Sequence, residues 1–333
     1  LAQIYKVPRT DSNGYLGGPA YYINNALHSP KTAVFFAILI SITYGLIFNS
    51  VQSNTISLSL QTAFNFDATM IGIVIAVFSG IVVFGGLHRI AKVTEYMVPI
   101  MAGIYLLIAF AITIYNISEL PTVLSVIFKD AWGIESVAGG SFGAAIMTGI
   151  KRGLFSNEAG MGSTPHAHAV AKVKHPVEQG FVAMIGVFID TFVILNLTAL
   201  VIITTGSRTT GLTGAQLSQY AFSTLYGKFG EIFIAICMLF FAFSTIIGWY
   251  FFGEANIRYL FGAKAVKIYS IIVCICVALG SLQEVELVWN MADCFNSMMV
   301  IPNAIALVAL SGLVKKTHDD YYNNFLPNQK KGK

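Results

Sequence analysis

The sequence is short of charge. Asp, Glu, Lys and Arg make up 11% of its 333 residues, against roughly 25% in ordinary soluble proteins. This shortage argues against a soluble protein. The net charge is only +4, and the basic residues form no stripe or basic-aromatic module, so we expect no nucleic acid among the partners.

Cysteine is also scarce. The chain has four cysteines, Cys237, Cys274, Cys276 and Cys294, and all lie in apolar runs, where free thiols pack as small hydrophobic groups. The pattern therefore favours neither a disulfide framework nor a metal site. His166 and His168 would point about 200° apart on a helix, so they cannot share one metal ion.

Apolar residues are abundant instead. They form 56% of the chain, and the mean hydropathy is +0.70. Apolar runs long enough to cross a bilayer cover residues 33–56, 69–87, 96–115, 138–170, 180–205, 229–252, 266–282 and 287–313. Long unbroken runs are unlike the short alternating segments of a β-barrel. They predict an all-α integral membrane protein with eight transmembrane spans.

The positive residues predict an orientation. If the first span runs outward from the cytoplasm, most Lys and Arg residues fall in the inner connections, as the positive-inside rule requires. This places both ends of the chain in the cytoplasm and predicts a multi-pass plasma-membrane protein, most simply of a bacterial inner membrane. The connections alternate between the two sides of the membrane in this way only if the weak fourth run, 138–170, crosses it.

The fourth run is interrupted by small and polar residues. We expect a first half-helix to end at Gly153, where glycine follows two cations, and a second to begin at Pro165, after two hydroxyl residues that can cap it. The backbone of residues 154–162 would then be unwound, which requires an enclosed or aqueous setting. Such a discontinuous helix is typical of the binding site of a secondary transporter. The alternative is a kinked or re-entrant segment that serves packing only.

Five charged residues lie away from the ends of the predicted spans, namely Lys151, Arg152, Glu158, Asp190 and Asp293. Charges at this depth are costly and mark the interior of the bundle. Glu158 lies in the break, where it can take a cation or an ammonium group. For Asp190 and Asp293, pairing with Lys151 or Arg152 and ion handling remain equal alternatives.

Two further spans carry polar faces. Asn49 and Gln52 are three residues apart on the first span, where hydrogen bonding between helices is an alternative to substrate contact. The Phe241 carbonyl and the hydroxyls of Ser244 and Thr245 have the spacing to converge, as the hard oxygen ligands of a small cation would. Their alternative is hydroxyls bonded back onto their own helix.

The residues around the break are recognisable. The segment GLFSNEAGMGSTPHAHA at 153–169 resembles the signature of the sodium:alanine symporter family, the alanine or glycine:cation symporters. Further resemblances to that family, in its order, are GGPAYYI at 17–23, NSVQSNTI at 49–56, FGGLHRIAKVTEYMVPIMAGIY at 84–105, HPVEQG at 175–180, GVFIDT at 186–191, FAFSTIIGWYFFGE at 241–254 and ADCFNSMMVIPNAIALVALS at 292–311. They cover essentially the whole chain.

The resemblance implies a leucine-transporter-type fold of two inverted five-helix repeats in one transmembrane domain. Residues 1–137 would hold the last three helices of the first repeat, 138–313 the second repeat, and 314–333 a cytoplasmic tail. The family's upstream broken helix, with a motif of the GTGNI kind, has no counterpart in the chain. We therefore expect an incomplete fold, a fragment that cannot transport alone.

The resemblance also implies a binding site. The amino-acid pocket would be lined by Ser156, Asn157, Glu158, Ala159 and Gly160, with Trp249, Asn49 and Gln52 as weaker candidates. Phe241, Ser244 and Thr245 would bind sodium, and no other metal is expected. Trp249 has a second interpretation as an anchor at the membrane interface.

These implications predict symport of a small amino acid, alanine or glycine, with sodium as the coupling ion, no cofactor and no enzymatic activity. Alternatives are a proton-coupled amino-acid permease of the same fold and a non-transporting membrane fragment. An intramembrane enzyme is disfavoured because no nucleophile and base stand at a working spacing.

Overall fold

The described part of the protein is almost entirely helical. The computed structural model describes residues 1–9, 14–132 and 141–331. Within them, the only strands are β1 (Val7–Pro8) and β2 (Tyr15–Leu16), which form one short antiparallel ladder. The predicted all-α class is confirmed for this part of the chain.

The helices follow one another with short connections. Before the undescribed residues 133–140 they are α1 (Pro19–Leu27), α2 (Pro30–Ile42), the π-helix η1 (Thr43–Phe48), α3 (Asn49–Phe64), α4 (Ala68–Val83), α5 (Gly86–Tyr115), the 3₁₀ turn η2 (Ile117–Glu119) and α6 (Leu120–Trp132). After them come α8 (Ser141–Asn157), α9 (Pro165–Val170), α10 (Pro176–Phe188), the π-helix η3 (Ile189–Ile194), α11 (Leu195–Thr204), η4 (Ser207–Thr209), α12 (Gly214–Phe261), α13 (Ala263–Gly280), α14 (Val285–Ala309), α15 (Ser311–Asp320), η5 (Tyr321–Phe325) and α16 (Leu326–Lys331).

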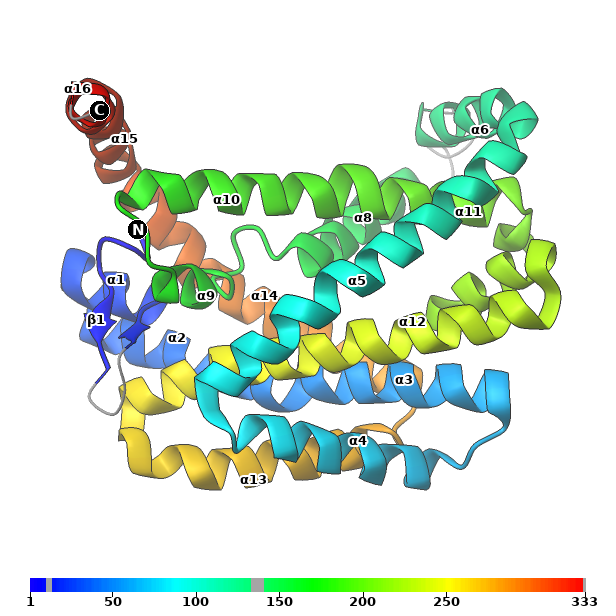
Figure 1. Ribbon diagram of the computed structural model, residues 1–333, viewed down its shortest axis with the longest axis horizontal. Helices are drawn as coiled ribbons and strands as arrows, with labels where there is room; N and C mark the ends of the chain where they lie inside the picture. Colours follow the sequence, from blue (N-terminus) through cyan, green and yellow to red (C-terminus); the bar gives the residue numbers. More distant parts are fainter. Residues whose placement is uncertain (10–13, 133–140, 332–333) are drawn as a thin grey trace.

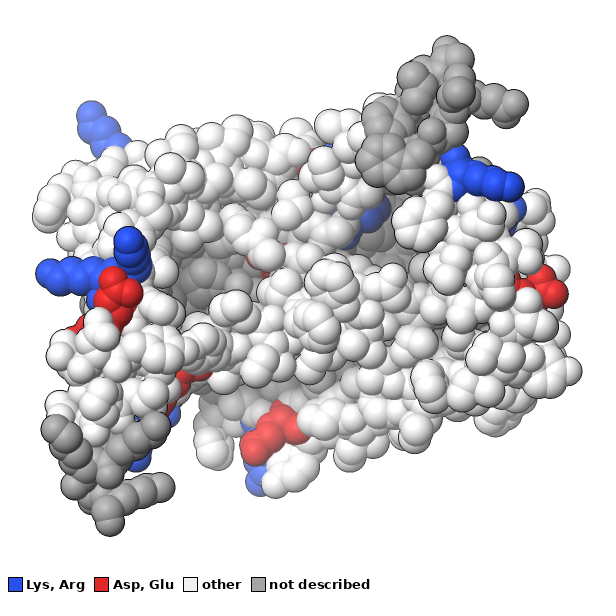
Figure 2. All heavy atoms as spheres, turned by 90° about the horizontal axis from the view of Figure 1, so that it is seen from above, with Lys and Arg blue, Asp and Glu red and all other residues white. Residues whose placement is uncertain are grey.

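The long helices run mostly along one axis of the molecule. Figure 1 shows α3, α4, α12 and α13 lying roughly lengthwise, with α5 crossing them obliquely and α10–α11 running along the opposite edge. The N- and C-terminal marks lie at the same end of the bundle. Figure 2 shows a face made mostly of uncharged residues, with the charged side chains gathered mainly toward its ends.

Six helical stretches of the described residues are long and apolar enough to cross a membrane. They are Pro30–Phe64, His88–Tyr115, Pro176–Thr204, Gly214–Phe261, Ala263–Gly280 and Val285–Ala309, and the shorter Ala68–Val83 is also apolar. Each predicted span except the fourth overlaps one of these helices. The fourth, 138–170, begins in the undescribed residues and continues as two shorter helices, α8 and α9.

Local sequence explains several helix boundaries. The Asp67 carboxylate accepts a hydrogen bond of 2.9 Å from the Met70 N–H and so caps α4. The His175 side chain and Glu178 form a capping box at the start of α10. Gly227 has φ 56° and ψ −140° inside α12. This conformation is open mainly to glycine, and it kinks α12 at Gly227. The apolar run predicted to begin at 229 corresponds to the part of α12 after this kink.

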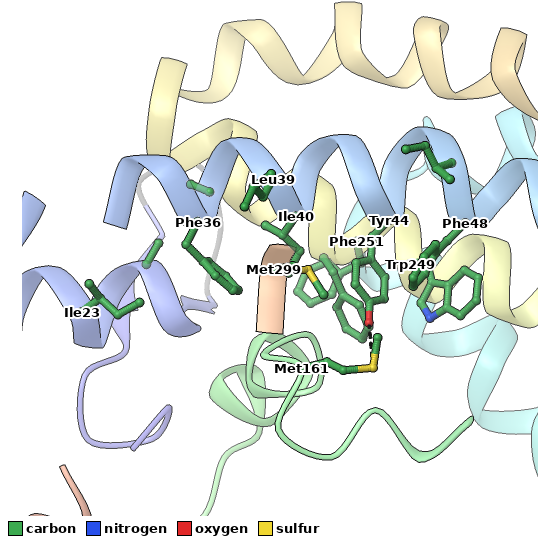
Figure 3. Close-up of a cluster of buried hydrophobic side chains, with 14 of the residues drawn as sticks. Ile23, Phe36, Leu39, Ile40, Tyr44, Phe48, Met161, Trp249, Phe251 and Met299 are labelled. Atoms are coloured by element: carbon green, nitrogen blue, oxygen red, sulfur yellow. Dashed lines mark hydrogen bonds between the residues drawn. The ribbon is translucent and has the colours of Figure 1, made fainter. Parts of the chain in front are cut away.

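An aromatic cluster lies where α2, η1, α12 and the segment after α8 meet. Figure 3 shows Tyr44, Phe48, Trp249 and Met161 drawn close together in it. The ring centroid of Trp249 lies 5.5 Å from that of Tyr44 and 5.1 Å from that of Phe48. This cluster contacts the segment that interrupts the fourth predicted span, through Met161 and Glu158.

Candidate functional site

The backbone break lies later than the sequence predicts. Helix α8 continues through Gly153 to Asn157, because the Glu158 N–H still bonds to the Leu154 carbonyl at 2.9 Å. Helical geometry ends at Glu158, whose φ is 55°. The Asn157 side chain then accepts the Ala159 N–H at 2.9 Å. The predicted helix end at Gly153 is therefore wrong, since glycine lowers helix propensity but does not stop an intact hydrogen-bond ladder.

The second half-helix begins at Pro165, as predicted, but without the predicted hydroxyl cap. The Thr164 side chain makes no capping hydrogen bond. The Ser163 hydroxyl instead donates to the Glu158 carboxylate at 2.5 Å. Residues 158–164 thus form the unwound segment, and within it the Ser163 hydroxyl hydrogen bonds to the buried Glu158 carboxyl group.

Glu158 is the chemical centre of this segment. Its side chain is buried, with 8% of the residue exposed, and its two carboxylate oxygens accept hydrogen bonds from Ser163 and from the indole N–H of Trp249. Among the described residues, no Lys or Arg forms a salt bridge with it. Because both donors are neutral, a cation that enters beside this carboxyl group would meet no competing positive charge there.

Trp249 is not an interfacial anchor. Its residue exposure is 6%, and its indole lies within the aromatic cluster drawn in Figure 3. The hydrogen bond to Glu158 ties α12 to the unwound segment across 91 residues of sequence. Of the two interpretations of Trp249, contact with the cavity is the one that this geometry supports.

A cavity of about 440 Å³ opens beside Glu158. It is lined by Gln52, Phe155, Ser156, Glu158, Asp190, Thr245, Gly248, Trp249 and Phe252. The wall therefore combines two carboxylates, an amide and two hydroxyls with three aromatic rings. Such a mixture of apolar surface and a few polar groups is typical of a site for a small polar ligand.

Asp190 faces the end of α8. Its carboxylate accepts the Ser156 hydroxyl at 2.9 and 3.2 Å, and the neighbouring Thr191 hydroxyl accepts the Asn157 amide at 3.0 Å. Asp190 lies in the π-helix η3, a helix type often found at functional sites. Of the two alternatives for Asp190, these contacts bring it to the cavity rather than to Lys151 or Arg152.

Asp293 takes the other alternative. Its carboxylate lies 2.6 Å from the Arg152 guanidinium and 3.9 Å from the Lys151 ammonium. The Arg152 guanidinium also stands 4.5 Å from the ring centre of Trp289. These charges pair with one another, and among the described residues none of the three lines the cavity.

The two predicted polar faces behave differently. Gln52 lines the cavity, whereas Asn49 is fully buried and donates its amide N–H to the Gly45 carbonyl of the preceding π-helix η1 at 3.2 Å. The hydroxyls of Ser244 and Thr245 both donate to the Phe241 carbonyl at 2.8 Å. This is the alternative in which the hydroxyls bond back onto their own helix. It also gathers three oxygens at one point, and one of their owners, Thr245, lines the cavity.

Several residues at the site were missed by sequence reasoning. Phe155 and Phe252 line the cavity, and Phe252 follows Trp249 by three positions, a spacing that places both on one helix face. Ala159 and Gly160, which the sequence did predict, belong to the unwound backbone but are not among the described residues that line the cavity. The Gly160 carbonyl accepts the Asn303 amide N–H at 2.8 Å. Asn303 could have been noticed from its place after Pro302 inside an apolar span.

Comparison with known proteins agrees with this architecture. The family model described as the sodium:alanine symporter family matches residues 1–333. The chain is 45% identical over 322 residues to the amino-acid carrier protein AlsT of Bacillus subtilis, covering 96% of this chain and 69% of that protein.

Two further relatives show the same pattern. The probable sodium/glutamine symporter GlnT of Bacillus subtilis is 44% identical over 323 residues, which is 96% of this chain and 67% of the relative. The sodium/alanine symporter AgcS of Methanococcus maripaludis is 38% identical over 318 residues, 93% of this chain and 70% of the relative. With its long apolar helices and a family model that spans it end to end, this multi-pass membrane protein is a transporter rather than an enzyme and belongs to the sodium:alanine symporter family.

Proposed function

We propose that the chain carries small neutral amino acids, alanine or glycine, across the membrane together with sodium. The observation that carries this proposal is the cavity in which the unwound segment presents Glu158 beside aromatic and hydroxyl side chains. An unwound segment between two half-helices offers free backbone groups to the charged ends of an amino acid. Transport would proceed by alternating access around this site.

The substrate would lie against residues 156–160. Glu158 supplies negative charge for the substrate ammonium or for a cation, and Ser156 and Trp249 stand at the same wall. Ala159 and Gly160 would contribute through the backbone of the break, Asn157 from the end of α8, and Gln52 through its amide. Because one relative is named a probable sodium/glutamine symporter, glutamine belongs among the substrates to be compared.

Sodium would bind at the Phe241 carbonyl and the hydroxyls of Ser244 and Thr245. Each hydroxyl donates its proton to that carbonyl and keeps lone pairs that can face a cation. Binding there would stabilise the conformation that also binds the amino acid, so coupling arises from different affinities in two states. No cofactor enters this proposal.

The proposed fold is the leucine-transporter type, with eight crossings and α8–α9 as a broken helix. The placement of both termini at one end of the bundle supports an even number of crossings (Figure 1). The excess of Lys and Arg in the inner connections supports a cytoplasmic location for both ends, and for the tail from residue 314. The proposed boundary between the repeats, at 137 and 138, lies outside the described residues.

Proton coupling is the alternative that one observation favours. Glu158 and Asp190 are both carboxyl groups lining the same cavity, and either could carry a proton. Under this alternative, uptake would follow an imposed proton gradient and would not need sodium.

Reconstituted vesicles separate these proposals. The chain is placed in liposomes, and uptake of labelled alanine, glycine and glutamine is measured under an inward sodium gradient, an inward proton gradient or neither. Sodium-driven uptake of alanine or glycine supports the proposal. Uptake driven by protons alone would establish the alternative. Absence of uptake under every gradient would refute transport by this chain and would agree with the expectation of a fragment that cannot transport alone.

Glu158→Gln tests the central residue. The amide keeps the size of the side chain but removes its charge, so we expect sodium-dependent uptake to fall by about ten- to a hundredfold. Glu231→Gln is the matched control, because Glu231 contacts Lys228 and does not line the cavity. Unaltered uptake in Glu158→Gln would remove the role assigned to that carboxylate.

A further inference from the structure

Asn303 of α14 bridges the unwound segment to α1. Its amide N–H donates to the Gly160 carbonyl at 2.8 Å, and its amide oxygen accepts the Tyr22 hydroxyl. Both side chains are almost fully buried, with exposures of 1% each. The unwound segment is therefore hydrogen bonded, through one side chain, to a helix 138 residues earlier in the sequence than Gly160.

The surroundings of this bridge leave little room for movement. Gly162 has φ +97°, and a Cβ atom there would lie 2.8 Å from Phe36, 2.9 Å from Pro19 and 3.0 Å from Asn303. Contacts this short exclude any side chain larger than hydrogen. Asn303 thus packs against Gly162 while it hydrogen bonds to Gly160, and fixes the segment at two points.

An asparagine is chemically suited to this place. An unwound carbonyl away from water needs a donor, and an amide supplies one while its oxygen accepts a second bond. The Gly160 carbonyl can only accept, so the NH₂ end of Asn303 faces it, and the Tyr22 hydroxyl donates to the amide oxygen at the other end. Tyr22 therefore holds the bridge in this orientation.

Asn303 and Tyr22 act at a distance from the cavity. Neither is among the residues that line the cavity beside Glu158. Tyr22 instead lines a second hollow of about 270 Å³, together with Thr164 and Pro165 at the other end of the segment. The bridge thus stands between the segment that presents Glu158 and a separate hollow.

We propose that Asn303, oriented by Tyr22, is a positioning residue for substrate binding. It holds the Gly160 carbonyl, and with it the curve of residues 158–162 that turns Glu158 toward Trp249 and the cavity. Loss of the bridge would loosen this curve and weaken substrate binding without removing any group that touches the substrate. This inference rests on the proposed transport function.

Kinetics of uptake give the first test. In its ionised form, Asn303→Asp keeps the shape and the acceptor for Tyr22 but has no donor for Gly160. Tyr22→Phe loses only the orienting hydroxyl. We expect KM for the amino acid to rise about three- to tenfold in both variants, as loss of one or two net hydrogen bonds implies, with the maximal rate per inserted protein within twofold of the parent. Tyr21→Phe is the matched control, since the ring of its neighbour Tyr21 packs on Tyr259.

Thiol labelling gives a second readout that needs no transport. Ala159 is exposed in the unwound segment, so it is replaced by cysteine in a protein whose own four cysteines are changed to alanine. Reaction with a maleimide should be several-fold faster when Asn303→Asp or Tyr22→Phe is added, and unchanged when Tyr21→Phe is added.

The outcomes are distinguishable. A higher KM together with faster labelling supports the positioning role. Lower protein yield with unchanged KM and unchanged labelling in the inserted protein would overturn it in favour of a purely structural role, as would equal effects of Tyr22→Phe and Tyr21→Phe. If the parent protein takes up no amino acid, the proposed function fails, and the labelling rates alone still decide whether the bridge holds the segment.

Discussion

The two halves of the broken helix are attached to the protein in different ways. Helix α8 has no fully buried residue among those whose side chains are described, whereas the much shorter α9 buries His166 and Ala169. The longer half-helix is thus the less buried one. The longer half lies largely outside the packed core, and the shorter half lies in it.

Apart from Phe155, whose ring packs against the aromatic cluster, helix α8 is held by polar bonds. Arg152 pairs with Asp293 at 2.6 Å, and Ser156 and Asn157 bond to Asp190 and Thr191 at 2.9 and 3.0 Å. Such contacts can be exchanged for contacts with water or ligand at small net cost. They suit an element whose position changes with the state of the site.

Helix α9 is held by close packing and by bonds at both faces. Its His166 ring nitrogens lie 2.7 Å from the Ser163 carbonyl and 2.7 Å from the Asn256 amide. Beyond its last turn, the Gln3 amide donates to the Ala171 carbonyl at 2.8 Å. An interrupted helix can thus have one half packed in the core and one half held mainly by polar contacts. We therefore expect motion during transport to be concentrated in α8.

The largest expected effect comes from glycine substitutions that contrast the two halves. A Cβ at Gly18, where φ is +132°, would lie 2.4 Å from His166, whereas a Cβ at Gly149 of α8 would meet nothing within 4 Å. We expect Gly18→Ala to destabilise the protein by about 3 kcal/mol through overpacking and strain. Gly149→Ala should be neutral or stabilising by up to about 1 kcal/mol. Thermal unfolding in detergent measures both, and equal unfolding temperatures would contradict the contrast.

A smaller effect is expected from the ion pair that tethers α8. Arg152→Leu leaves the Asp293 carboxylate without its nearer partner, and we expect a loss of about 1 kcal/mol, because the pair is partly exposed (39% and 22%). Adding Asp293→Leu should recover much of that loss, since no unpaired charge then remains. A double-mutant cycle on thermal unfolding provides the measurement. Additive effects in this cycle would show that the pair does not tether α8.

The smallest effect on stability is expected at the cavity end of α8. Ser156→Ala removes the hydroxyl that bonds to Asp190, a loss of about 0.5–1 kcal/mol. Its clearer signature should be faster proteolysis or hydrogen exchange in α8, with α9 unchanged. Ser297→Ala is a suitable control, because the Ser297 hydroxyl donates to the Asp293 carbonyl of its own helix. Equal changes in α8 and α9 would mean that the two halves move together.

Several features of the fold followed from the sequence because they depend on neighbouring residues. The apolar runs predicted the long helices, and Pro165 marked the start of α9. The family was recognisable from the segment around Glu158. The end of α8 was misplaced by four residues, because glycine and cations at 151–153 favour a helix end only weakly when the ladder continues to Glu158.

Which residues share the candidate site was harder to predict. Helical spacing placed Asn49 and Gln52 on one face, but the rotation of α3 against α12 leaves Gln52 at the cavity and Asn49 buried against its own backbone. The same reasoning treated Asp190 and Asp293 alike. One of them meets Ser156 and the other meets Arg152.

By itself, the sequence determined that the chain is an all-α protein of the lipid bilayer, and to which family it belongs. Hydropathy and local motifs are properties of single segments of the chain. Only the tertiary structure decided that Trp249 meets Glu158, that Asn303 meets Gly160 and that α9 rather than α8 is packed. These pairings join residues 91 and 143 positions apart. Their partners are set by how whole helices rotate and pack, and no local pattern encodes that choice.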